Sequence, residues 1–424
     1  MTPDTSSRRT FLAGSAAAAA SASLLPSAFA AGNDLIRVGL VGCGGRGTGA
    51  ASQALQADPN VKLVAMCDAF KDRLDGSLRE LRNISAIAGK IDVTPERCFD
   101  GFDGYQRLLA SGVDVVLLCT PPGFRPQHLR AAIDAGKHVF CEKPVAVDAT
   151  GVSSVIETAK LAKDKNLGLC SGFCYRYDQA KRETVKRIHD GMIGGVQAMH
   201  ITYLTGTLWH RGEDPKWSEM EYQMRNWYYY TWLSGDFIVE QHCHNFDKAA
   251  WVFKGEMPVA CTAVGGRQVR TDPKYGHIYD HFAATFEYRS GAKLFSHCRQ
   301  MAGCNGDVND HVFGTKGQAQ LMRHSISVNG GTGWELGEGE VKNMYQVEHD
   351  ELFASIRAGR PINDGEAAAN STLMAILARE AAYSGKRITW AQMMASKQNM
   401  VPANPTWGPH QVGGVPQPGQ YQFV

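Results

Sequence analysis

The sequence has 424 residues, which is too long for one small domain and is typical of two domains. Hydrophobic residues make up 44% of the chain and charged residues 20%, values that exclude a wholly disordered, fibrous or collagen-like protein. Lys and Arg total 44 against 42 Asp and Glu, a formal net charge of +2. This balance does not favour nucleic-acid or membrane-surface binding driven by net charge, so a small-molecule partner and no nucleic acid are expected.

The N-terminus has the features of an export signal. Arg8 and Arg9 precede an apolar, Ala-rich stretch that ends in the small residues Ala28 and Ala30. The stretch is too short and too rich in Ala and Gly for a membrane span, and its end fits a signal-peptidase site. The paired arginines resemble a twin-arginine signal, which serves the export of folded proteins. We expect the twin-arginine translocase to recognise residues 1–30, which leaves a periplasmic or other extracytoplasmic protein without a membrane anchor.

A glycine-rich turn follows the first strongly apolar run. Gly42, Gly44 and Gly47 have the G-x-G-x-x-G spacing, and Asp68 ends the next apolar run about twenty residues later. Glycines at these positions permit a tight turn, the approach of backbone to a pyrophosphate, and close packing of helix on strand. Asp68 would accept hydrogen bonds from the adenosine ribose, which favours NAD, while two basic residues soon after it keep NADP as an alternative.

Apolar runs and helical segments continue to alternate after this turn. Strands are expected at 113–120 and 137–144, and helices at 126–135 and 148–165. Strands without polar alternation, separated by helices, are typical of a parallel sheet covered on both faces. Residues 31–172 are therefore predicted to form a Rossmann dinucleotide-binding domain whose ligand lies at the carboxyl ends of the strands.

The pattern changes in the second half of the chain, where strands follow one another without helices between them. This order predicts an open, mostly antiparallel sheet in a second domain at residues 173–400. The strands are expected near 196–204, 258–267, 281–289, 292–300 and 310–314, and helices near 178–191, 345–358 and 365–383. Residues 401–424 are rich in Pro, Gly and Gln and predict an extended arm that wraps a neighbouring subunit or stays loose.

Aromatic residues are concentrated in a long segment at 203–234, which includes Trp209 and Trp227. Aromatic rings stack on the apolar faces of sugar rings, and a long insertion is often a binding loop. Packing in a core or an interface explains the same residues equally well.

Three motifs in the order of the chain carry a family resemblance. They are the run CTPPGFRPQHLRAAIDAGKHVFCEKP at 119–144, the stretch Gly-Met-Ile-Gly at 191–194, and His244 with Asp247 and Trp251 on one helix. Together they resemble the Gfo/Idh/MocA oxidoreductases, typified by glucose-fructose oxidoreductase and inositol dehydrogenase. The resemblance implies a Rossmann domain followed by an open-faced sheet whose exposed face forms subunit contacts, and hence a homo-oligomer.

The resemblance also implies roles for particular residues. Lys143 would lie beside the nicotinamide and hold the substrate hydroxyl, and His244 with Glu240 would act in proton transfer. Positions 240 and 244 share a face if one helix carries both, so the carboxylate could orient the imidazole. The expected cofactor-binding residues are Gly42, Cys43, Gly44, Gly45, Arg46, Gly47, Asp68, Thr120, Pro121, His128, Glu142 and Lys143. The expected substrate-binding residues are Tyr175, Arg176, Trp227, His242 and Asp247.

The chain departs from the family pattern at two of these positions. Glu240 stands where the family usually has Asp, and His242 stands where it usually has Gly. On a strand, 240, 242 and 244 would share a face and could bind a metal, whereas on the helix implied downstream His242 points elsewhere. We expect the helix and no metal site, with His242 in a second active-site role or in packing.

Export constrains the mechanism. NAD loaded in the cytoplasm and carried outside would meet no nicotinamide pool, so it must be tightly bound and recycled in place. The favoured function is hydride transfer between a sugar, cyclitol or glycoside hydroxyl and this bound cofactor, with a second carbonyl substrate restoring it. One alternative is an NAD-dependent glycosidase that uses a transient keto-sugar, although that subgroup's Tyr-Pro-Thr-His stretch is not found. The other is a non-catalytic glycan- or nucleotide-binding protein.

Overall fold

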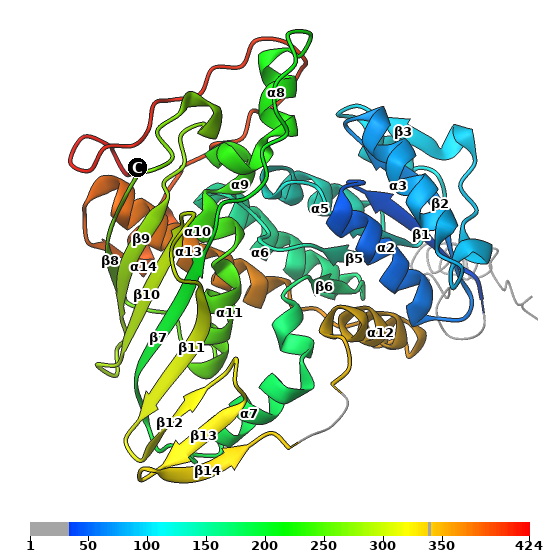
Figure 1. Cartoon of the computed structure of the whole chain (residues 1–424). Coiled ribbons are helices and arrows are strands. Elements are labelled where there is room, and N and C mark those ends of the chain that lie inside the picture. The colour runs from blue at the N-terminus through cyan, green and yellow to red at the C-terminus, as the bar shows by residue number, and fades with distance from the viewer. Residues whose placement is uncertain (1–33, 338–340) are drawn as a thin grey trace, which may run out of the picture.

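The computed structural model describes residues 34–337 and 341–424 (Figure 1). The predicted export signal at residues 1–30 lies outside the described residues, so it stays a prediction. Among the helices of the described ranges, none combines the length and the apolar character needed to span a membrane.

The first sheet has six described strands, all parallel, in the order β3-β2-β1-β4-β5-β6. They are β1 (Ile36–Val41), β2 (Val61–Asp68), β3 (Cys98–Asp100), β4 (Val115–Leu118), β5 (His138–Cys141) and β6 (Leu169–Ser171). The accompanying helices are α2 (Gly45–Ala57), α3 (Lys71–Asn83), α4 (Gly104–Leu109), α5 (Arg125–Asp134) and α6 (Ala149–Asp164). Every residue of β4 is buried, as an apolar strand covered on both faces requires. The predicted Rossmann fold is confirmed.

The second sheet has nine strands in the described part of the chain, in the order β14-β13-β12-β11-β7-β10-β9-β8-β15. Neighbouring strands are antiparallel except for β7 and β10, so the predicted open, mostly antiparallel sheet is confirmed. The strands are β7 (Val196–Thr205), β8 (Ala260–Gly266), β9 (His281–Glu287), β10 (Lys293–Gln300), β11 (Asp307–Gly314), β12 (Gly317–Gln320), β13 (Ser325–Val328), β14 (Gly331–Glu335) and β15 (Ile388–Thr389). The last three strands of the β11–β14 meander were not predicted.

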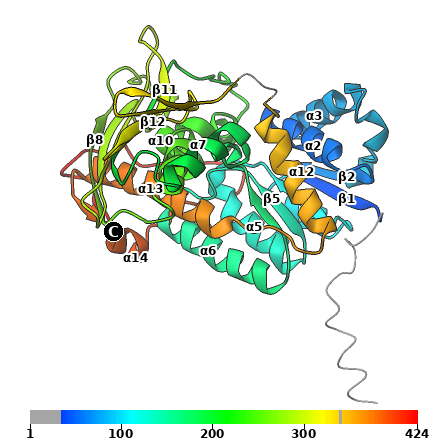
Figure 2. The same cartoon turned by 90° about the horizontal axis from the view of Figure 1, so that it is seen from below.

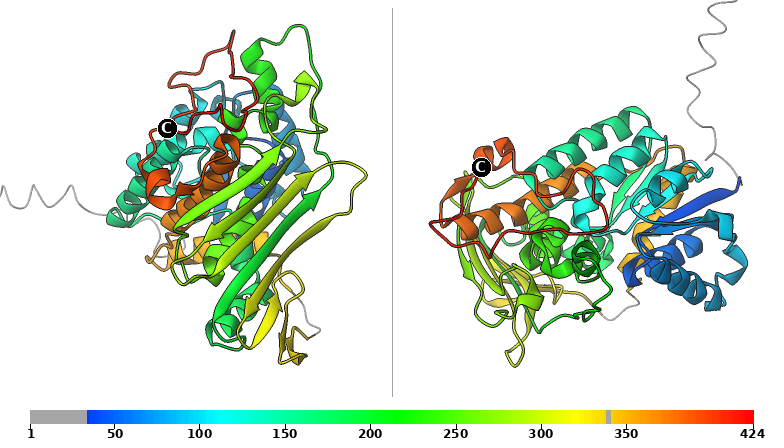
Figure 3. Two further views of the ribbon diagram at one scale, coloured as in Figure 1. Left: turned by 90° about the vertical axis from the view of Figure 1, so that its left-hand side faces the viewer. Right: turned by 90° about the horizontal axis from the view of Figure 1, so that it is seen from above.

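Helices cover one face of this second sheet. Of the helices on this side, α11 (Cys243–Val252) and α13 (Gly365–Ser384) pack directly on the strands. The other helices of this half are α7 (Gln179–His189), α8 (Glu219–Arg225), α9 (Thr231–Ser234), α10 (Phe237–Glu240) and α14 (Trp390–Ala395). The other face is open (Figure 3, left) and presents Val264, Phe295 and Phe313 at 70%, 38% and 40% exposure. The predicted homo-oligomer would use this face and stays a prediction.

Helix α12 (Met344–Arg357) belongs to the second half of the sequence but packs on α2 (Figure 2). Its buried residues Leu352, Phe353 and Ile356 join the core that α2 and α3 form with the first sheet. The Arg357 guanidinium pairs with Asp58 at 2.8 Å. The boundary expected at residue 172 therefore does not separate two independently packed units.

The C-terminal arm lies along its own chain (Figure 3, right), and its predicted contact with a neighbouring subunit stays a prediction. The Met220 N–H donates to the Gly408 carbonyl at 3.0 Å, and the Gly419 N–H donates to the Ser384 carbonyl at 3.1 Å. The Tyr279 hydroxyl donates to the Pro416 carbonyl at 2.8 Å. The arm thus crosses from α13 to α8 at the top of the molecule in Figure 1.

Candidate active site

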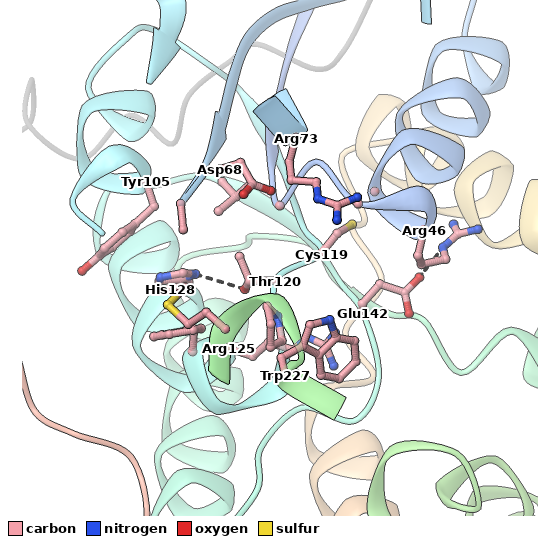
Figure 4. A pocket seen from close by; sticks show the side chains of 18 of the residues that line it. Arg46, Asp68, Arg73, Tyr105, Cys119, Thr120, Arg125, His128, Glu142 and Trp227 are labelled. Carbon is pink, nitrogen blue, oxygen red and sulfur yellow. Dashed lines mark hydrogen bonds and ion pairs between the residues drawn. The ribbon is translucent and has the colours of Figure 1, made fainter. Parts of the chain in front are cut away.

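A cavity of about 710 Å³ lies between the two domains (Figure 4). Its walls come from the glycine turn after β1, the carboxyl ends of β2, β4 and β5, the turn between α10 and α11, the start of α12, and the C-terminal arm. This is the edge of a parallel α/β sheet at which ligands bind, and the volume is within the usual range of small-molecule sites.

The glycine turn requires glycine at two positions. Gly42 has a φ of +95°, which side-chain-bearing residues rarely adopt. A Cβ on Gly47 would overlap the carbonyl oxygen of Gly42. At Gly44 a Cβ would meet no atom within 4 Å, because this backbone faces the cavity at the start of α2. Backbone N–H groups at a helix N-terminus favour a phosphate there.

Gly47→Ala is expected to lower the free energy of unfolding by about 1–3 kcal/mol, since α2 must move away from the turn. It should also weaken NAD binding, measured by calorimetric titration. Gly49→Ala is the matched control on the same helix, because its Cβ would meet only the end of the Arg46 side chain at 3.4 Å. A Gly47→Ala protein as stable as the control would contradict this account of the turn.

Asp68 holds the turn and faces the cavity. Its carboxylate accepts the Cys43 N–H at 2.7 Å and the Phe70 N–H at 2.9 Å. Burial raises the pKa of Asp68, against the opposing effect of these donors. Of the two basic residues that follow, Lys71 pairs with Asp75 at 3.0 Å, whereas Arg73 lines the cavity (Figure 4).

The ends of β4 and β5 supply a second group of polar side chains. Glu142 accepts from the Arg46 Nε at 2.6 Å and from the Lys143 backbone N–H at 3.1 Å, so it links the glycine turn to the lysine. The Thr120 hydroxyl lies 3.2 Å from Nδ1 of His128. Burial, reinforced by the charge of Arg125, lowers the pKa of His128 to about 3, so this imidazole is neutral.

Lys143 and Glu240 meet across the two domains. The Lys143 Nζ donates to the backbone carbonyl oxygen of Glu240 at 2.6 Å and to Oε1 of the Glu240 side chain at 3.2 Å. Burial has the largest single effect and alone would lower the Lys143 pKa, but the nearby acidic groups, Glu240 first among them, together outweigh it and the pKa is raised. Lys143 is therefore a protonated ammonium group at the cavity wall.

The prediction that one helix carries both Glu240 and His244 is wrong. Glu240 ends α10, and His244 lies at the start of α11, after a turn at Gln241 and His242. The Glu240 carboxylate pairs with Lys143, so it orients the lysine and does not orient the imidazole.

His244 lines the same cavity as a neutral imidazole. Burial, followed by the positive charges of Lys143 and Lys248, lowers its pKa well below the usual value. Its ring packs edge-on against Tyr175 and Phe173, with centroid distances of 5.2 and 6.0 Å. Its Nδ1 is buried and has no hydrogen-bond partner in the described ranges.

Comparison with known proteins identifies the family. The family model described as "Oxidoreductase family, NAD-binding Rossmann fold" matches residues 36–168, and the "GFO/IDH/MocA C-terminal domain" matches residues 182–320. The chain belongs to the Gfo/Idh/MocA oxidoreductases. The resemblance expected from the motifs is thus confirmed, and the protein is an enzyme with an NAD-binding domain.

Individual relatives align with most of this Gfo/Idh/MocA oxidoreductase or with part of it. Inositol 2-dehydrogenase of Rhizobium meliloti is 27% identical over 323 residues, which are 76% of this chain and 86% of the relative. A glycosyl hydrolase family 109 protein of Streptomyces coelicolor is 30% identical over 175 residues, 41% of this chain and 35% of its own. The crystal structure of an aldose-aldose oxidoreductase from Caulobacter crescentus has the same fold, with a TM-score of 0.64, 21% identity, and coverage of 84% of this chain and 99% of that one.

The cavity of this Gfo/Idh/MocA oxidoreductase fits NAD. The bare backbone at Gly44 and Gly45 faces the space where a pyrophosphate would lie, and Asp68 lies where an adenosine ribose would lie. Thr120, Pro121, His128, Glu142 and Lys143 continue the wall toward Glu240 and His244. Most of the expected cofactor-binding residues are thus brought together, while Cys43 contributes its backbone N–H to Asp68 and buries its thiol.

Four expected substrate-binding residues lie outside the cavity wall, and only Trp227 lines it. Tyr175 packs behind His244. Arg176 is used in an ion pair with Asp247 at 2.8 Å. His242 is fully buried and bonds through Nε2 to the Ser296 hydroxyl at 2.8 Å, so it packs. The structure does not support the alternative metal site: Glu240 pairs with Lys143, His242 bonds to Ser296 and His244 packs on Tyr175, and the described ranges contain no group of three His, Cys, Asp or Glu side chains that could hold a metal ion.

Several cavity residues were not predicted. Gln241 lies between the predicted residues Glu240 and His242, and it accepts a hydrogen bond from the Tyr203 hydroxyl at 2.6 Å. Arg73 is one of the two basic residues after Asp68 that keep NADP as an alternative. Tyr345, whose ring lies 4.9 Å from the Arg46 guanidinium, and residues 403–405 come from distant segments that carry no local motif.

Proposed function

We propose that this enzyme transfers hydride between a hydroxyl of a sugar or cyclitol and tightly held NAD, and that it works outside the cytoplasm. The observation that carries the proposal is the Lys143 ammonium and the neutral His244 imidazole on the wall of one cavity. The Rhizobium meliloti relative, named as an inositol dehydrogenase, supports the cyclitol or sugar class. The paired arginines at Arg8 and Arg9 support export.

Lys143 and His244 have different roles at the substrate hydroxyl. An ammonium has three N–H donors, and Glu240 accepts two from Lys143, which leaves one for the substrate oxygen. This positive charge stabilises the alkoxide that forms as the O–H bond breaks. Neutral His244 accepts the proton. When bound, NAD supplies the acceptor for the hydride that leaves the carbon atom bearing this hydroxyl.

The wall near these residues suits a ring with polar edges. Trp227 and Trp209 line the cavity with ring centroids 6.0 Å apart, and aromatic faces pack on the C–H faces of sugar rings. Gln241 adds an amide to the same cavity wall. These residues support a carbohydrate-like substrate.

His244→Ala is expected to reduce the rate of the chemical step by about 10²–10⁴-fold, because the proton acceptor is lost. Single-turnover measurement of nicotinamide reduction isolates this step. His200→Ala is the matched control, since His200 lies on the open sheet face beside His297 and away from the cavity. Equal rates for the two variants would leave His244 with a packing role.

The acidic limb of the pH profile should lie below that of an ordinary histidine. Because the His244 pKa is lowered from 6.5, the imidazole stays neutral as the pH falls through 6.5. We expect kcat/KM to hold from neutrality through this value and to decline only at lower pH. A decline centred at or above pH 6.5 would contradict His244 as the base.

Direct measurement of the cofactor tests the proposal as a whole. The exported protein is purified from the periplasm without added nucleotide, and bound NAD is measured by mass spectrometry after dialysis. A panel of sugars and cyclitols is then added while reduced nicotinamide is followed by absorbance. Reduction by one compound and reoxidation by another, on stoichiometric bound NAD, is the expected result. Empty protein that needs free NAD would refute the closed cycle.

The likeness to a glycosyl hydrolase family 109 protein favours one second candidate, a redox-neutral glycosidase. In that reaction the oxidised sugar loses its aglycone before the hydride returns. Release of nitrophenol from a nitrophenyl glycoside, without net accumulation of reduced nicotinamide, distinguishes it from sugar-to-sugar transfer.

A further inference from the structure

The C-terminal arm forms part of the cavity. Residues 403–405 line it directly. Two residues further on, the Trp407 ring packs on Phe102 and on Phe70, with centroid distances of 4.5 and 5.4 Å. Phe70 and Phe102 line the cavity themselves, so the arm closes over two of its aromatic walls.

These aromatic walls mark the adenosine end of the cavity. Phe70 lies two residues beyond Asp68, the acidic residue at the end of β2 that faces the adenosine ribose in this fold. Phe102 follows the end of the adjacent strand, β3. The reacting groups Lys143 and His244 lie on other elements, at the ends of β5 and in α11. The arm is thus placed to contact the adenosine and not the reacting ring.

Helix α8 reinforces the arm. The Arg225 guanidinium donates to both carboxylate oxygens of Asp72 at 3.2 Å and lies 4.1 Å from the Phe70 ring centroid. The same helix holds the arm, because the Gln223 amide donates to the His410 carbonyl at 2.8 Å and the helix's second residue bonds to the arm backbone. Arm and helix therefore rest on the first domain as one connected piece.

We infer that residues 403–407 and Arg225 form a cover over the adenosine end of the NAD site, and that this cover slows the release of NAD. The inference rests on the proposed function, which requires NAD to stay bound between turnovers. For NAD to leave, the Trp407 ring must separate from Phe70 and Phe102, or the ion pair of Arg225 with Asp72 must break. The cover thus acts on the rate of release and takes no part in hydride or proton transfer.

Trp407→Ala in the full chain tests the cover. Loss of the two aromatic contacts is expected to raise the dissociation rate of NADH by about tenfold. The rate is measured by stopped-flow fluorescence while excess NAD displaces bound NADH. Gln417→Ala is the matched control, because Gln417 is an exposed residue of the same arm outside the cavity wall. Its dissociation rate should equal that of the unchanged protein.

Limited proteolysis gives an independent measurement. Saturating NAD should slow cleavage within residues 401–412 in the unchanged protein and should protect Trp407→Ala much less. Equal dissociation rates in Trp407→Ala and Gln417→Ala, with no protection by NAD, would overturn the cover and leave the proposed function standing. Failure of the unchanged protein to bind NAD or NADH at all would overturn both.

Discussion

Lys143→Ala is expected to lower turnover by about a thousandfold while NAD stays bound. The substitution removes the one N–H that Glu240 leaves for a substrate oxygen, together with the positive charge that stabilises an alkoxide. The residues that would hold NAD at the glycine turn and at Asp68 are untouched. Turnover is measured with saturating sugar, and bound NAD is measured by mass spectrometry on the same dialysed sample.

Lys143→Ala also leaves the Glu240 carboxylate buried without its positively charged partner, so a loss of stability must be separated from a loss of turnover. Adding Glu240→Gln to Lys143→Ala removes that charge, so the double variant should recover thermal stability and stay inactive. Lys163→Ala, an exposed lysine on α6, is the matched control and should keep full turnover. Normal turnover in Lys143→Ala would refute the role proposed for the ammonium.

Asp310→Asn is expected to lower the free energy of unfolding by about 3–5 kcal/mol. The Asp310 carboxylate pairs with Lys248, and both side chains are fully buried. Burial lowers the pKa of Lys248, and the charge of Asp310 opposes this effect. With Asn at 310 the ammonium would be buried without a counter-charge. Urea unfolding followed by circular dichroism measures the change.

Adding Lys248→Met to Asp310→Asn should restore much of the stability, because the unpaired charge is then gone. Asp92→Asn is the surface control: Asp92 is 59% exposed and pairs with Lys62 at 3.5 Å. Its loss should cost less than about 1 kcal/mol. If Asp310→Asn lowers the free energy of unfolding no more than Asp92→Asn does, the buried pair stabilises the fold no more than the surface pair does.

The parallel sheet was predictable because its signals are local. The stretch 115–119 is apolar throughout, and the glycine turn constrains its own backbone. The strands at 317–335 escaped prediction because they are short, and the last of them, β14, is mostly exposed, so apolar alternation is weak. They are defined by pairing with β11 and with each other, which single segments do not reveal.

The residues of the site, like the strands, were predictable where their signals are local in the sequence. Residues in contiguous motifs, such as Lys143 and His244, were found. The pairing of Glu240 was missed because α10 and α11 are separate helices: Asp236, with a φ of +74°, begins one, and a turn at 241–242 precedes the other. Tyr345 reaches the cavity only because α12 packs on α2, a contact between segments about 300 residues apart.

The position of α12 also limits how the protein can be divided. Residues 31–172 expressed alone would expose to water the face of α2 that α12 now covers, and would lose Leu352, Phe353 and Ile356 from their core. They would also leave Asp58 without Arg357. Residues 31–172 alone therefore cannot be transferred to another protein as an intact nucleotide-binding domain. A chimera that joins it to another partner domain has to carry residues 344–357 along, and the chain must be nearly complete before that half acquires its final helix.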